Sequence, residues 1–585
     1  MEEFYAELIK TIKGKSPTSK ELNRIKNRLV KKYSMKKIPT NADILLNANP
    51  EDLKDLKIIT KPTRTLSGVA PIALMCKPHK CPHGTCIYCP GGPGSEFGDV
   101  PQSYTGNEPS TMRSMRNNYD PYFVVFNRLE QYVILNQNSD KVEIIIQGGT
   151  FLSLDKEYKD EFVMYIFKAL NDFSDMFFKK GVLEFNKFRD FFELPGDIYN
   201  PKRKVLIHKK LAKLKLNSDL VTEQLRNETS KIRCVGLTIE TKPDWGLLNQ
   251  SLEMLKYGCT RVELGAQSTD DKIQKITNRG HGIRETIDST RILKDLGFKI
   301  NYHMMPGLPL SNPKKDLEML KETIDNPDYR PDMFKIYPTM VMKGTGLFQL
   351  YKTGKYKSLE RESAADIISD FMGYVPYWIR IMRVQRDIPT KVTEAGVDKT
   401  NLRQYVDALM KKHEKEAKVK GKNKCRCIRC REAGHVFRKF KQIPDQKNVK
   451  LIVRGYEASE GVEWFISFED TKQDILLGFC RLRLPARDLV DIKNKKEITN
   501  NIAFIRELHV VGEAIEIGAT KIKGKKPKLN IQHKGLGKQL IKEAENIAKQ
   551  FCKKKMIVIS GIGARDYYRK LGYKKEGVYM VKTIK

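Results

Sequence analysis

Strand-like apolar runs alternate with amphipathic helical stretches from Pro71 to about Pro389. This alternation is typical of βα units, whose parallel strands form one sheet beneath a layer of helices. The expected strands span residues 142–146, 234–239, 261–264, 299–304 and 334–337. The alternation therefore predicts an α/β fold with a partial parallel barrel, in which the chemistry lies at the carboxyl ends of the strands.

Polar residues end or follow these strands, where a barrel of this kind carries its active site. They are the stretch Glu240-Thr-Lys-Pro-Asp244, and Glu263, Gln267, Ser268, His303 and Lys335. Any single one of them is more often structural than catalytic, so the prediction rests on the pattern as a whole. We expect these side chains to line one site.

Three cysteines stand at CxxxxCxxC spacing in Cys81-Pro-His-Gly-Thr-Cys86-Ile-Tyr-Cys89. An iron-sulfur cube is normally closed by four thiolates, so three leave one iron open. That iron can chelate S-adenosylmethionine (SAM), which the protein must hold still. A zinc knuckle or a set of buried thiols is the alternative, and a structural zinc ion needs a fourth ligand nearby. The candidates for that ligand are Cys76, His79 and His83.

A glycine pair, Gly148 and Gly149, follows the expected strand at 142–146. Glycine lets the backbone approach a ligand closely, although such a pair alone usually marks only a turn. Together with the three-cysteine loop, the pair predicts backbone held against the amino group of SAM.

The chain carries a large excess of positive charge, with 107 Lys and Arg against 71 Asp and Glu and a net charge of +36. This excess indicates a polyanionic partner, and nucleic acid is the expected one. The alternative is the Lys- and Glu-rich surface of a heat-loving organism, but that surface would balance its charges by sign. Residues 1–65 hold 15 Lys and Arg against 8 Asp and Glu at helical apolar spacing, which predicts a basic helical module for gripping RNA.

Cellular location is also constrained by the sequence. No apolar run reaches the roughly 18 residues of a membrane span, so no membrane partner is expected. The N-terminus lacks the order of a signal peptide. Eleven cysteines, six of them in two tight clusters, are typical of metal sites in a reducing compartment. A cytoplasmic protein of three or four domains is expected.

A second cysteine cluster, Cys425, Cys427 and Cys430, lies in residues 411–450, which hold 15 Lys and Arg against 4 Asp and Glu. We expect a structural zinc knuckle that pins a linker at residues 391–445, with a redox trio as the alternative. The nearest candidates for a fourth ligand are His413 and His435, and the sequence does not choose between them.

From about residue 446 the pattern predicts antiparallel strands. They are expected at residues 451–453, 464–468, 474–484 and 503–511. The stretch Gln532-His-Lys-Gly535-Leu-Gly537-Lys538 then leads into an amphipathic helix, and a glycine-rich turn at a helix N-terminus can cradle a phosphate.

Two adjacent tyrosines, Tyr567 and Tyr568, follow the last strand expected at 556–560. The order of strand, glycine turn, helix, strand and late tyrosine matches an acetyl-CoA-binding fold. A tyrosine hydroxyl there could donate a proton to the leaving thiolate. One of the two tyrosines is expected in the core and the other at the site.

Short stretches spread over the chain carry a family resemblance. They are CPHGTCIYCPGGP, SYTGNEPSTMR, IETKPDW, YGCTRVELGAQS, NRGH, HMMPGLP, KIYPT, RVQRDIP, CRCIRCRE, RELHV, QHKGLG and YYRKLGY. From about Lys61 onward the chain resembles the catalytic subunit of the Elongator complex and its stand-alone archaeal and bacterial homologues. The short gap between Cys81 and Cys86 resembles the archaeal form, for which no other Elongator subunits are expected as partners.

The resemblance implies a radical-SAM barrel at residues 66–390 and a GNAT-type acetyltransferase domain at residues 446–585, acting together on wobble uridine 34 of tRNA. In the implied reaction, a deoxyadenosyl radical abstracts hydrogen from the methyl group of acetyl-CoA. That carbon joins uridine C5, and thioester hydrolysis leaves 5-carboxymethyluridine. The implied cofactors are a [4Fe-4S] cluster, SAM, acetyl-CoA and structural zinc, and the cluster needs an electron donor. The alternative is a protein lysine acetyltransferase with a structural iron-sulfur domain and Glu507 as general base.

The resemblance also assigns residues by position. Cys81, Cys86 and Cys89 would hold the cluster, and Gly148 and Gly149 would face SAM. Lys141 matches a family lysine that contacts acetyl-CoA from the barrel side, and Tyr568 would stand at the thioester. The residues expected to bind CoA are Glu507, Leu508, His509, Val510, Gln532, His533, Lys534, Gly535, Leu536, Gly537, Lys538 and Gln539.

The zinc site departs from the family pattern at one position. Many relatives have a histidine directly after a Gly-Val-Glu stretch, whereas this chain has Gly396-Val397-Asp398-Lys399. Three zinc ligands, Cys425, Cys427 and Cys430, are therefore expected, and the fourth stays open.

Overall fold

The computed structural model describes residues 2–15, 17–35, 37–53, 55–56, 58, 68–196, 200–416, 424–486, 490–491, 496–497, 501–511 and 535–584. Four helices come first: α1 (Glu2–Ile12), α2 (Ser19–Lys32), α3 (Asn41–Leu46) and α4 (Pro50–Leu53). Thr18 and Glu21 form a capping box that begins α2. Phe4, Leu8 and Leu29 are buried in a small apolar core that this helical module forms by itself.

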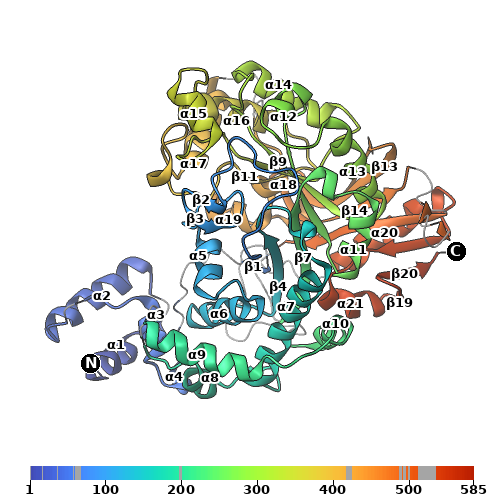
Figure 1. Cartoon of the computed structure of the whole chain (residues 1–585). Coiled ribbons are helices and arrows are strands. Elements are labelled where there is room, and N and C mark those ends of the chain that lie inside the picture. The colour runs from blue at the N-terminus through green and yellow to red at the C-terminus, as the bar shows by residue number, and fades with distance from the viewer. Residues whose placement is uncertain are drawn as a thin grey trace.

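Seven parallel strands form the central sheet and lie side by side in chain order. They are β1 (Ala70–Met75), β4 (Lys141–Gln147), β7 (Arg233–Thr241), β8 (Arg261–Gln267), β9 (Lys299–Met304), β10 (Met333–Ile336) and β11 (Arg380–Arg383). The five strands expected from the sequence are all present. The sheet curls into a half-barrel at the centre of the molecule (Figure 1).

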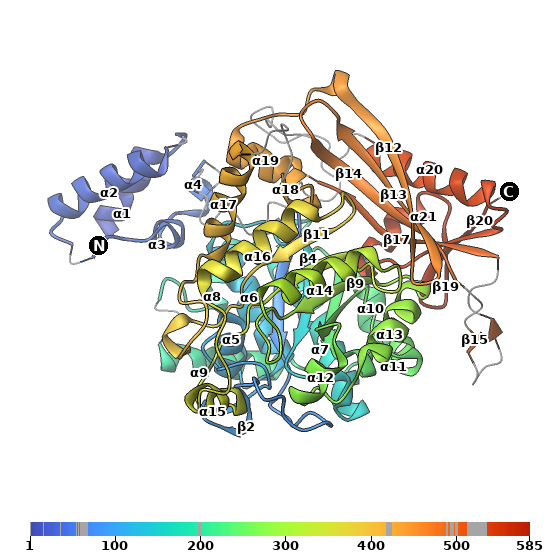
Figure 2. The same ribbon diagram turned by 90° about the horizontal axis from the view of Figure 1, so that it is seen from above.

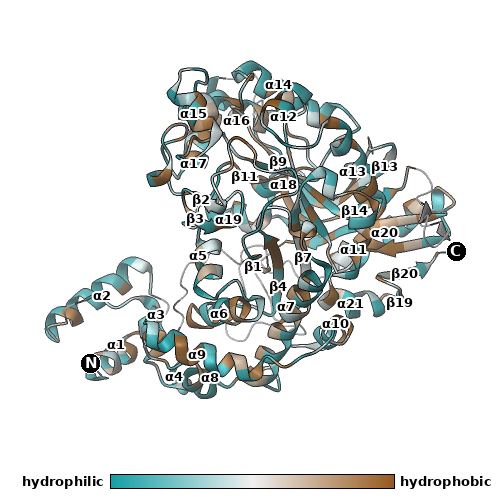
Figure 3. Cartoon of the chain, viewed as in Figure 1, coloured by the Kyte–Doolittle hydropathy of each residue, from teal (hydrophilic) through white to brown (hydrophobic). Residues whose placement is uncertain are grey.

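Helices lie between successive strands of this sheet in the chain. They are α5 (Pro109–Arg116), α6 (Pro121–Ile134), α7 (Lys156–Phe177), α8 (Phe185–Phe191), α9 (Pro201–Leu214), α10 (Leu220–Thr229), α11 (Leu248–Lys256), α12 (Asp271–Ile276), α13 (Ile283–Asp295), α14 (Pro313–Asp325), α15 (Gly346–Lys352) and α16 (Arg361–Tyr374). Figure 3 shows apolar colour on β1 and β4 and mixed polar and apolar colour along the helices, as expected for helices that bury one face. Helix α9 packs against α6, because the Arg203 guanidinium of α9 contacts the buried Glu130 carboxylate of α6.

Short elements and a helical linker complete this half of the chain. The short elements are β2 (Gly92–Ser95), β3 (Gly98–Val100), η1 (Phe151–Ser153), β5 (Phe178–Lys179), β6 (Val182–Leu183), η2 (Pro243–Trp245) and η3 (Thr390–Val392). The linker contains α17 (Leu402–Glu416), α18 (Ile428–Arg431), α19 (Ala433–Phe440) and η4 (Gln446–Asn448).

A second seven-stranded sheet forms the C-terminal part, in the order β12-β13-β14-β17-β18-β20-β19. Its strands are β12 (Val449–Ala458), β13 (Gly461–Asp470), β14 (Ile475–Leu484), β17 (Ile502–Val510), β18 (Lys555–Val558), β19 (Lys574–Glu576) and β20 (Tyr579–Thr583). The remaining elements are β15 (Val490–Asp491), β16 (Lys496–Glu497), α20 (Leu536–Gln550), η5 (Ile562–Ala564) and α21 (Arg565–Arg569). All pairs in this sheet are antiparallel except β17 with β18, and α20 lies between these two strands in sequence.

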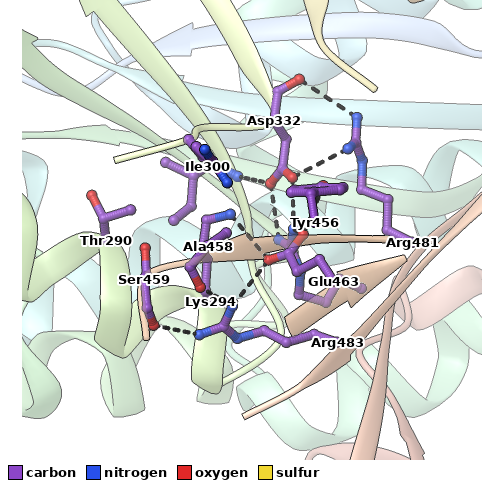
Figure 4. Close-up of polar contacts among 12 residues, drawn as sticks. Thr290, Lys294, Ile300, Asp332, Tyr456, Ala458, Ser459, Glu463, Arg481 and Arg483 are labelled. Carbon is purple, nitrogen blue, oxygen red and sulfur yellow. Dashed lines mark hydrogen bonds and ion pairs between the residues drawn. The ribbon is translucent and has the colours of Figure 1, made fainter. Parts of the chain in front are cut away.

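The C-terminal sheet packs against the edge of the half-barrel where the parallel strands begin. The Arg506 guanidinium of β17 donates to Asp332, just before β10, with distances of 2.6 and 2.9 Å. Lys294 Nζ, near the end of α13, lies 3.0 Å from the Glu463 carboxylate of β13. These side chains are fully buried, and Figure 4 shows Asp332, Lys294 and Glu463 converging with Arg481 and other residues.

Figures 1 and 2 show the N-terminal helices and the C-terminal sheet on opposite flanks of the half-barrel. Among the described residues, every helix is too short or too polar to cross a lipid bilayer.

Candidate functional site

A cavity of about 120 Å³ opens at the edge of the half-barrel where the parallel strands end. Cys81, Cys86 and Cys89 line one wall, on the loop that follows β1. The structure therefore places the three-cysteine loop at the end of the barrel where the sequence predicted the chemistry.

Each of the three thiols has a polar neighbour. Cys81 Sγ lies 3.4 Å from Thr150 Oγ1, and Arg279 donates to Cys86 Sγ at 3.4 Å. The Ser103 amide donates to Cys89 Sγ at 3.1 Å. These donors suit sulfurs that carry negative charge.

The spacing of the three sulfurs fits a cluster better than a single ion. Around one tetrahedral zinc ion, with Zn–S near 2.3 Å, sulfurs stand about 3.8 Å apart. Within the described residues, groups of three possible ligands closer than 4.8 Å do not include Cys81, Cys86 and Cys89, whereas Cys425, Cys427 and Cys430 form such a group. The first set has room for a larger group between its sulfurs.

The candidate extra ligands for a zinc ion at this loop are mostly engaged elsewhere. The Cys76 thiol donates to the Gly148 carbonyl at 3.0 Å, and His79 Nε2 lies 3.2 Å from the Thr150 carbonyl. His83 alone stands beside one of the three thiols, with Nε2 3.3 Å from Cys86 Sγ.

The glycine pair after β4 forms the next part of the wall. Gly148 has φ +116°, and a Cβ there would come within 2.7 Å of Cys76 Sγ. Gly149 has φ +73°, and a Cβ would point to Cys81 Sγ at 3.5 Å. Both backbone conformations favour glycine, so this turn brings bare backbone to the cysteine loop.

Buried charges from consecutive strands form the floor of the cavity. Glu240, near the end of β7, accepts hydrogen bonds from Tyr104 and from Gln147, each at 2.8 Å. Lys335 Nζ of β10 lies 3.2 Å from Glu240 Oε1 and also contacts Glu263 Oε2 of β8. Lys335 therefore joins two carboxylates that are 23 positions apart in sequence.

His303, on β9, completes the floor. Its Nε2 lies 2.8 Å from Glu263 Oε2, and because an ionised carboxylate only accepts, Nε2 carries the proton. Burial and the Lys335 charge lower the pKa of His303 below 6.5, although Glu263 opposes them. Burial alone would raise the pKa of Glu263, but Lys335 and His303 hold it well below 4.5. The site thus combines a neutral imidazole with an ionised carboxylate.

Ligand atoms of Glu240, Glu263 and His303 lie within 4.8 Å of one another, a spacing that could hold a metal ion. The Lys335 ammonium contacts both carboxylates of this group. We therefore infer that the Lys335 ammonium takes the position that a metal ion could occupy between these side chains.

The structure brings Glu240, Glu263, Gln267 and His303, all predicted from the strand ends, to the wall of one cavity. Sequence reasoning missed several cationic side chains there. They are Arg279, Arg383 and Arg386, whereas Lys242 belongs to the predicted stretch 240–244 and lines the same wall. The only signal for these three arginines was their place in NRGH and RVQRDIP. Both stretches support the family resemblance, but it assigned no functional role to these arginines.

Arg261 extends the charged floor toward the C-terminal sheet. It is the first residue of β8, and its guanidinium lies 2.7 Å from Glu143 and 3.4 Å from Glu263. Burial lowers the pKa of Arg261, but the charges of Glu143, Glu263 and Glu507 together raise it above its ordinary value. Glu507 belongs to β17, so charged side chains inside the barrel lead from the cavity to the C-terminal sheet.

Lys141 lies at the other end of its strand from the glycine pair. It is the first residue of β4, half-buried, on the edge where the C-terminal sheet packs. Burial lowers its pKa, and Asp140 only partly opposes this.

The glycine turn of the C-terminal part is described from Gly535 onward. Gly535 has φ +80° and begins α20, whose first turn contains Leu536, Gly537, Lys538 and Gln539. Gln532, His533 and Lys534, predicted to bind CoA, lie outside the described residues.

The two adjacent tyrosines lie in different surroundings. A Cβ at Gly537 would stand 2.6 Å from the Tyr567 hydroxyl and 3.7 Å from Val510. Tyr567 is 41% exposed, whereas Tyr568 is 6% exposed and packs in the apolar core of this part. Tyr567 is thus the tyrosine beside the glycine turn and the end of β17.

Family models match most of the chain. One described as "Radical SAM superfamily" matches residues 76–321, and one described as "Radical_SAM C-terminal domain" matches residues 331–412. A third, "ELP3 N-terminal domain", matches residues 1–66. The half-barrel and its three-cysteine loop thus define a radical SAM protein.

Full-length relatives narrow the assignment. The chain is 43% identical to the tRNA uridine(34) acetyltransferase of Methanocaldococcus jannaschii, across 98% of this chain and 95% of that protein. It is 40% identical to Elongator complex protein 3 of Saccharomyces cerevisiae, across 97% and 93%. The solved structure of Methanocaldococcus infernus Elp3 without residues 1–46 matches at TM-score 0.69 and 38% identity, across 89% of this chain and all of that one. The chain belongs to the Elongator complex protein 3 family.

Proposed function

We propose that this protein modifies wobble uridine 34 of tRNA to 5-carboxymethyluridine, with SAM and acetyl-CoA as co-substrates. Uridine 34 of tRNA is named in the descriptions of its archaeal relatives. One observation carries the proposal: the three-thiol cavity and the glycine turn belong to two sheets that pack against each other through the buried ion pair of Arg506 with Asp332.

In the barrel, Cys81, Cys86 and Cys89 would hold a [4Fe-4S] cluster, and the spread of their sulfurs fits it. With SAM bound, such a cluster supplies one-electron chemistry that can break an unactivated C–H bond. Gly148 and Gly149 would present bare backbone to SAM, and Arg279 would stabilise the Cys86 thiolate. An external electron donor is required.

We assign the C-terminal sheet to a GNAT-like acetyl-CoA-binding domain. Its support is the parallel pair of β17 and β18 with α20 between them in the chain, and the glycine turn at the N-terminus of α20. The first amides of a helix have no partner within the helix and can meet a pyrophosphate. The strand residues Glu507 to Val510 precede that turn. The resemblance assigned Tyr568 to the thioester. Because the Tyr567 hydroxyl lies beside Gly537 and Tyr568 is buried, we propose instead that Tyr567 donates the proton to the CoA thiolate and that Tyr568 has a core role. Lys141 would approach acetyl-CoA from the barrel side.

The alternative of a protein lysine acetyltransferase needs a general base, and Glu507 is its candidate. A general base works best with a pKa near the operating pH. Burial alone would raise the pKa of Glu507, but Lys299 and Arg481 hold it below 4.5. Glu507 also accepts from Arg481 Nε of the neighbouring strand β14 at 2.9 Å, so its carboxylate is held in an ion pair within the C-terminal sheet.

A tRNA partner accounts for the net charge of +36. The basic N-terminal module is proposed to contact its phosphates, and Cys425, Cys427 and Cys430 are proposed to hold zinc. Affinity for tRNA should fall with salt, with each neutralised phosphate contributing about −0.7 to −0.9 to the slope of log affinity against log salt.

The test is an anaerobic reaction with reconstituted protein, SAM, acetyl-CoA, a reductant and unmodified tRNA, followed by nucleoside analysis. Carboxymethyluridine from the wild type and none from Cys86→Ser would support the proposal. Acetylation of protein lysines in air, unchanged by Cys86→Ser, would establish the acetyltransferase alternative instead.

A further inference from the structure

Cys425, Cys427 and Cys430 surround one point between the two halves of the chain. Their sulfurs lie within 4.8 Å of one another. Cys427 precedes α18 and Cys430 lies within it, so one helical turn fixes two of the three thiols. This spacing fits a single thiophilic divalent ion, around which sulfurs stand about 3.8 Å apart.

In the part of the chain that the structure describes, no histidine nitrogen or carboxylate oxygen joins these three sulfurs at the same spacing. The His413 ring lies 3.4 Å from the Ser369 hydroxyl. His435 Nε2 lies 3.6 Å from the Glu432 carboxylate. Residues 417–423, which precede Cys425, include no histidine, cysteine, aspartate or glutamate.

A cavity of about 470 Å³ opens beside this site, and Cys425 and Cys430 form part of its wall. Arg403 Nη2, also in the wall, donates to Cys430 Sγ at 3.3 Å. The wall is strongly basic, with six cationic side chains against the carboxylates of Asp407 and Glu414. The cationic ones are Arg403, Lys411, Lys424, Arg429, Arg438 and Lys439.

We propose that the three thiolates hold Zn²⁺ and leave its fourth coordination position to an exchangeable ligand that enters from this cavity, namely a small anionic thiol, with water in its place otherwise. Structural zinc sites are closed by four protein ligands, whereas sites that bind a small molecule keep one position open. Three thiolates on Zn²⁺ carry one net negative charge, which the Arg403 guanidinium offsets. A thiolate suits zinc, and the basic wall attracts an anion.

The test uses zinc-edge X-ray absorption on the full-length protein purified without thiols, because iron in the barrel does not contribute at that edge. The expected spectrum has three sulfurs near 2.3 Å, one oxygen near 2.0 Å and no imidazole scattering. Adding 3-mercaptopropionate should replace the oxygen by a fourth sulfur with saturable dependence, and propionate should not. An imidazole signal that persists with the thiol, or less than one zinc per chain, would overturn the proposal.

Two variants sharpen this test. His435→Ala should keep the zinc content and the spectrum. Loss of a nitrogen ligand in this variant would identify His435 as the fourth ligand and refute an open position.

Arg403→Gln should keep zinc and weaken 3-mercaptopropionate binding at least tenfold, because the charge that offsets the thiolates is gone. Unchanged affinity would refute the electrostatic part of the proposal. No readout here depends on tRNA modification, so the two proposals stand or fall separately.

Discussion

Arg506 and Asp332 form a two-pronged ion pair, 2.6 and 2.9 Å, across the contact between the C-terminal sheet and the half-barrel. Asp332 stands three residues before Lys335, the cation on the floor of the cavity, and Arg506 stands directly before Glu507. One buried pair therefore connects the strand that carries the barrel's lysine with the strand proposed to bind acetyl-CoA.

Removing Arg506 should be strongly destabilising. Arg506→Leu leaves the fully buried carboxylates of Asp332 and Glu463 without the guanidinium that they share. The free energy of unfolding should therefore fall by about 3 to 5 kcal/mol. The control is Lys156→Met, which breaks the exposed pair between Lys156 and Asp160 on α7 and should leave the unfolding midpoint unchanged. Urea unfolding of both variants checks this. Equal midpoints for the two variants would show that the buried pair adds nothing to stability.

Stability should also depend on acid pH through Glu463. Burial alone would raise the pKa of Glu463, but Arg506 and Lys294 outweigh it and lower the pKa from 4.5 to about 2. A carboxyl whose pKa is lower in the folded state stabilises it above pH 4.5, and this contribution is lost as pH falls toward 2. The loss should be about 3 kcal/mol. Between pH 5 and 2, the unfolding midpoint of the wild type should therefore fall more steeply than that of Glu463→Gln, and parallel curves would contradict this assignment.

Gly149→Ala should weaken SAM binding roughly tenfold while the protein keeps its iron, because the added methyl group points toward Cys81 Sγ where SAM is proposed to meet the backbone. Gly354→Ala is the matched control. Gly354 has nearly the same φ, +71°, and a Cβ there meets open space. Both variants carry a similar backbone strain of about 1 to 2 kcal/mol. Equal SAM affinity in the two variants, measured by equilibrium dialysis, would count against this role for the glycine pair.

Tyr567→Phe should slow tRNA-dependent hydrolysis of acetyl-CoA about a hundredfold without changing CoA affinity, because only the proton donor is lost. The Tyr568→Phe variant should hydrolyse acetyl-CoA at nearly the wild-type rate, since the ring of Tyr568 lies in the core. The reverse result, a slow Tyr568→Phe and an active Tyr567→Phe, would place Tyr568 at the thioester.

Much of the barrel could be predicted because its strands are short, apolar and regularly spaced. Residues such as Glu263 and His303 could be assigned to one site because the carboxyl ends of parallel strands meet at one edge. The residue pattern alone did not choose between Tyr567 and Tyr568, and the resemblance assigned Tyr568 to the thioester. Neighbours on a helix point about 100° apart, and only tertiary packing decides which of them faces the core.

Ion pairs between residues far apart in the sequence could not be predicted from the sequence either. Arg261 meets Glu143, and Arg506 meets Asp332, at distances along the chain where no local pattern connects the partners.

The most direct test of the account follows the methyl hydrogens of acetyl-CoA. Reconstituted protein, SAM, acetyl-CoA with a deuterated methyl group and unmodified tRNA are combined without oxygen, and deoxyadenosine and the wobble nucleoside are analysed by mass. We predict deuterium in deoxyadenosine together with carboxymethyluridine in the tRNA, since both sites would then serve one reaction. Unlabelled deoxyadenosine and unmodified tRNA, with acetyl groups on protein lysines, would contradict it.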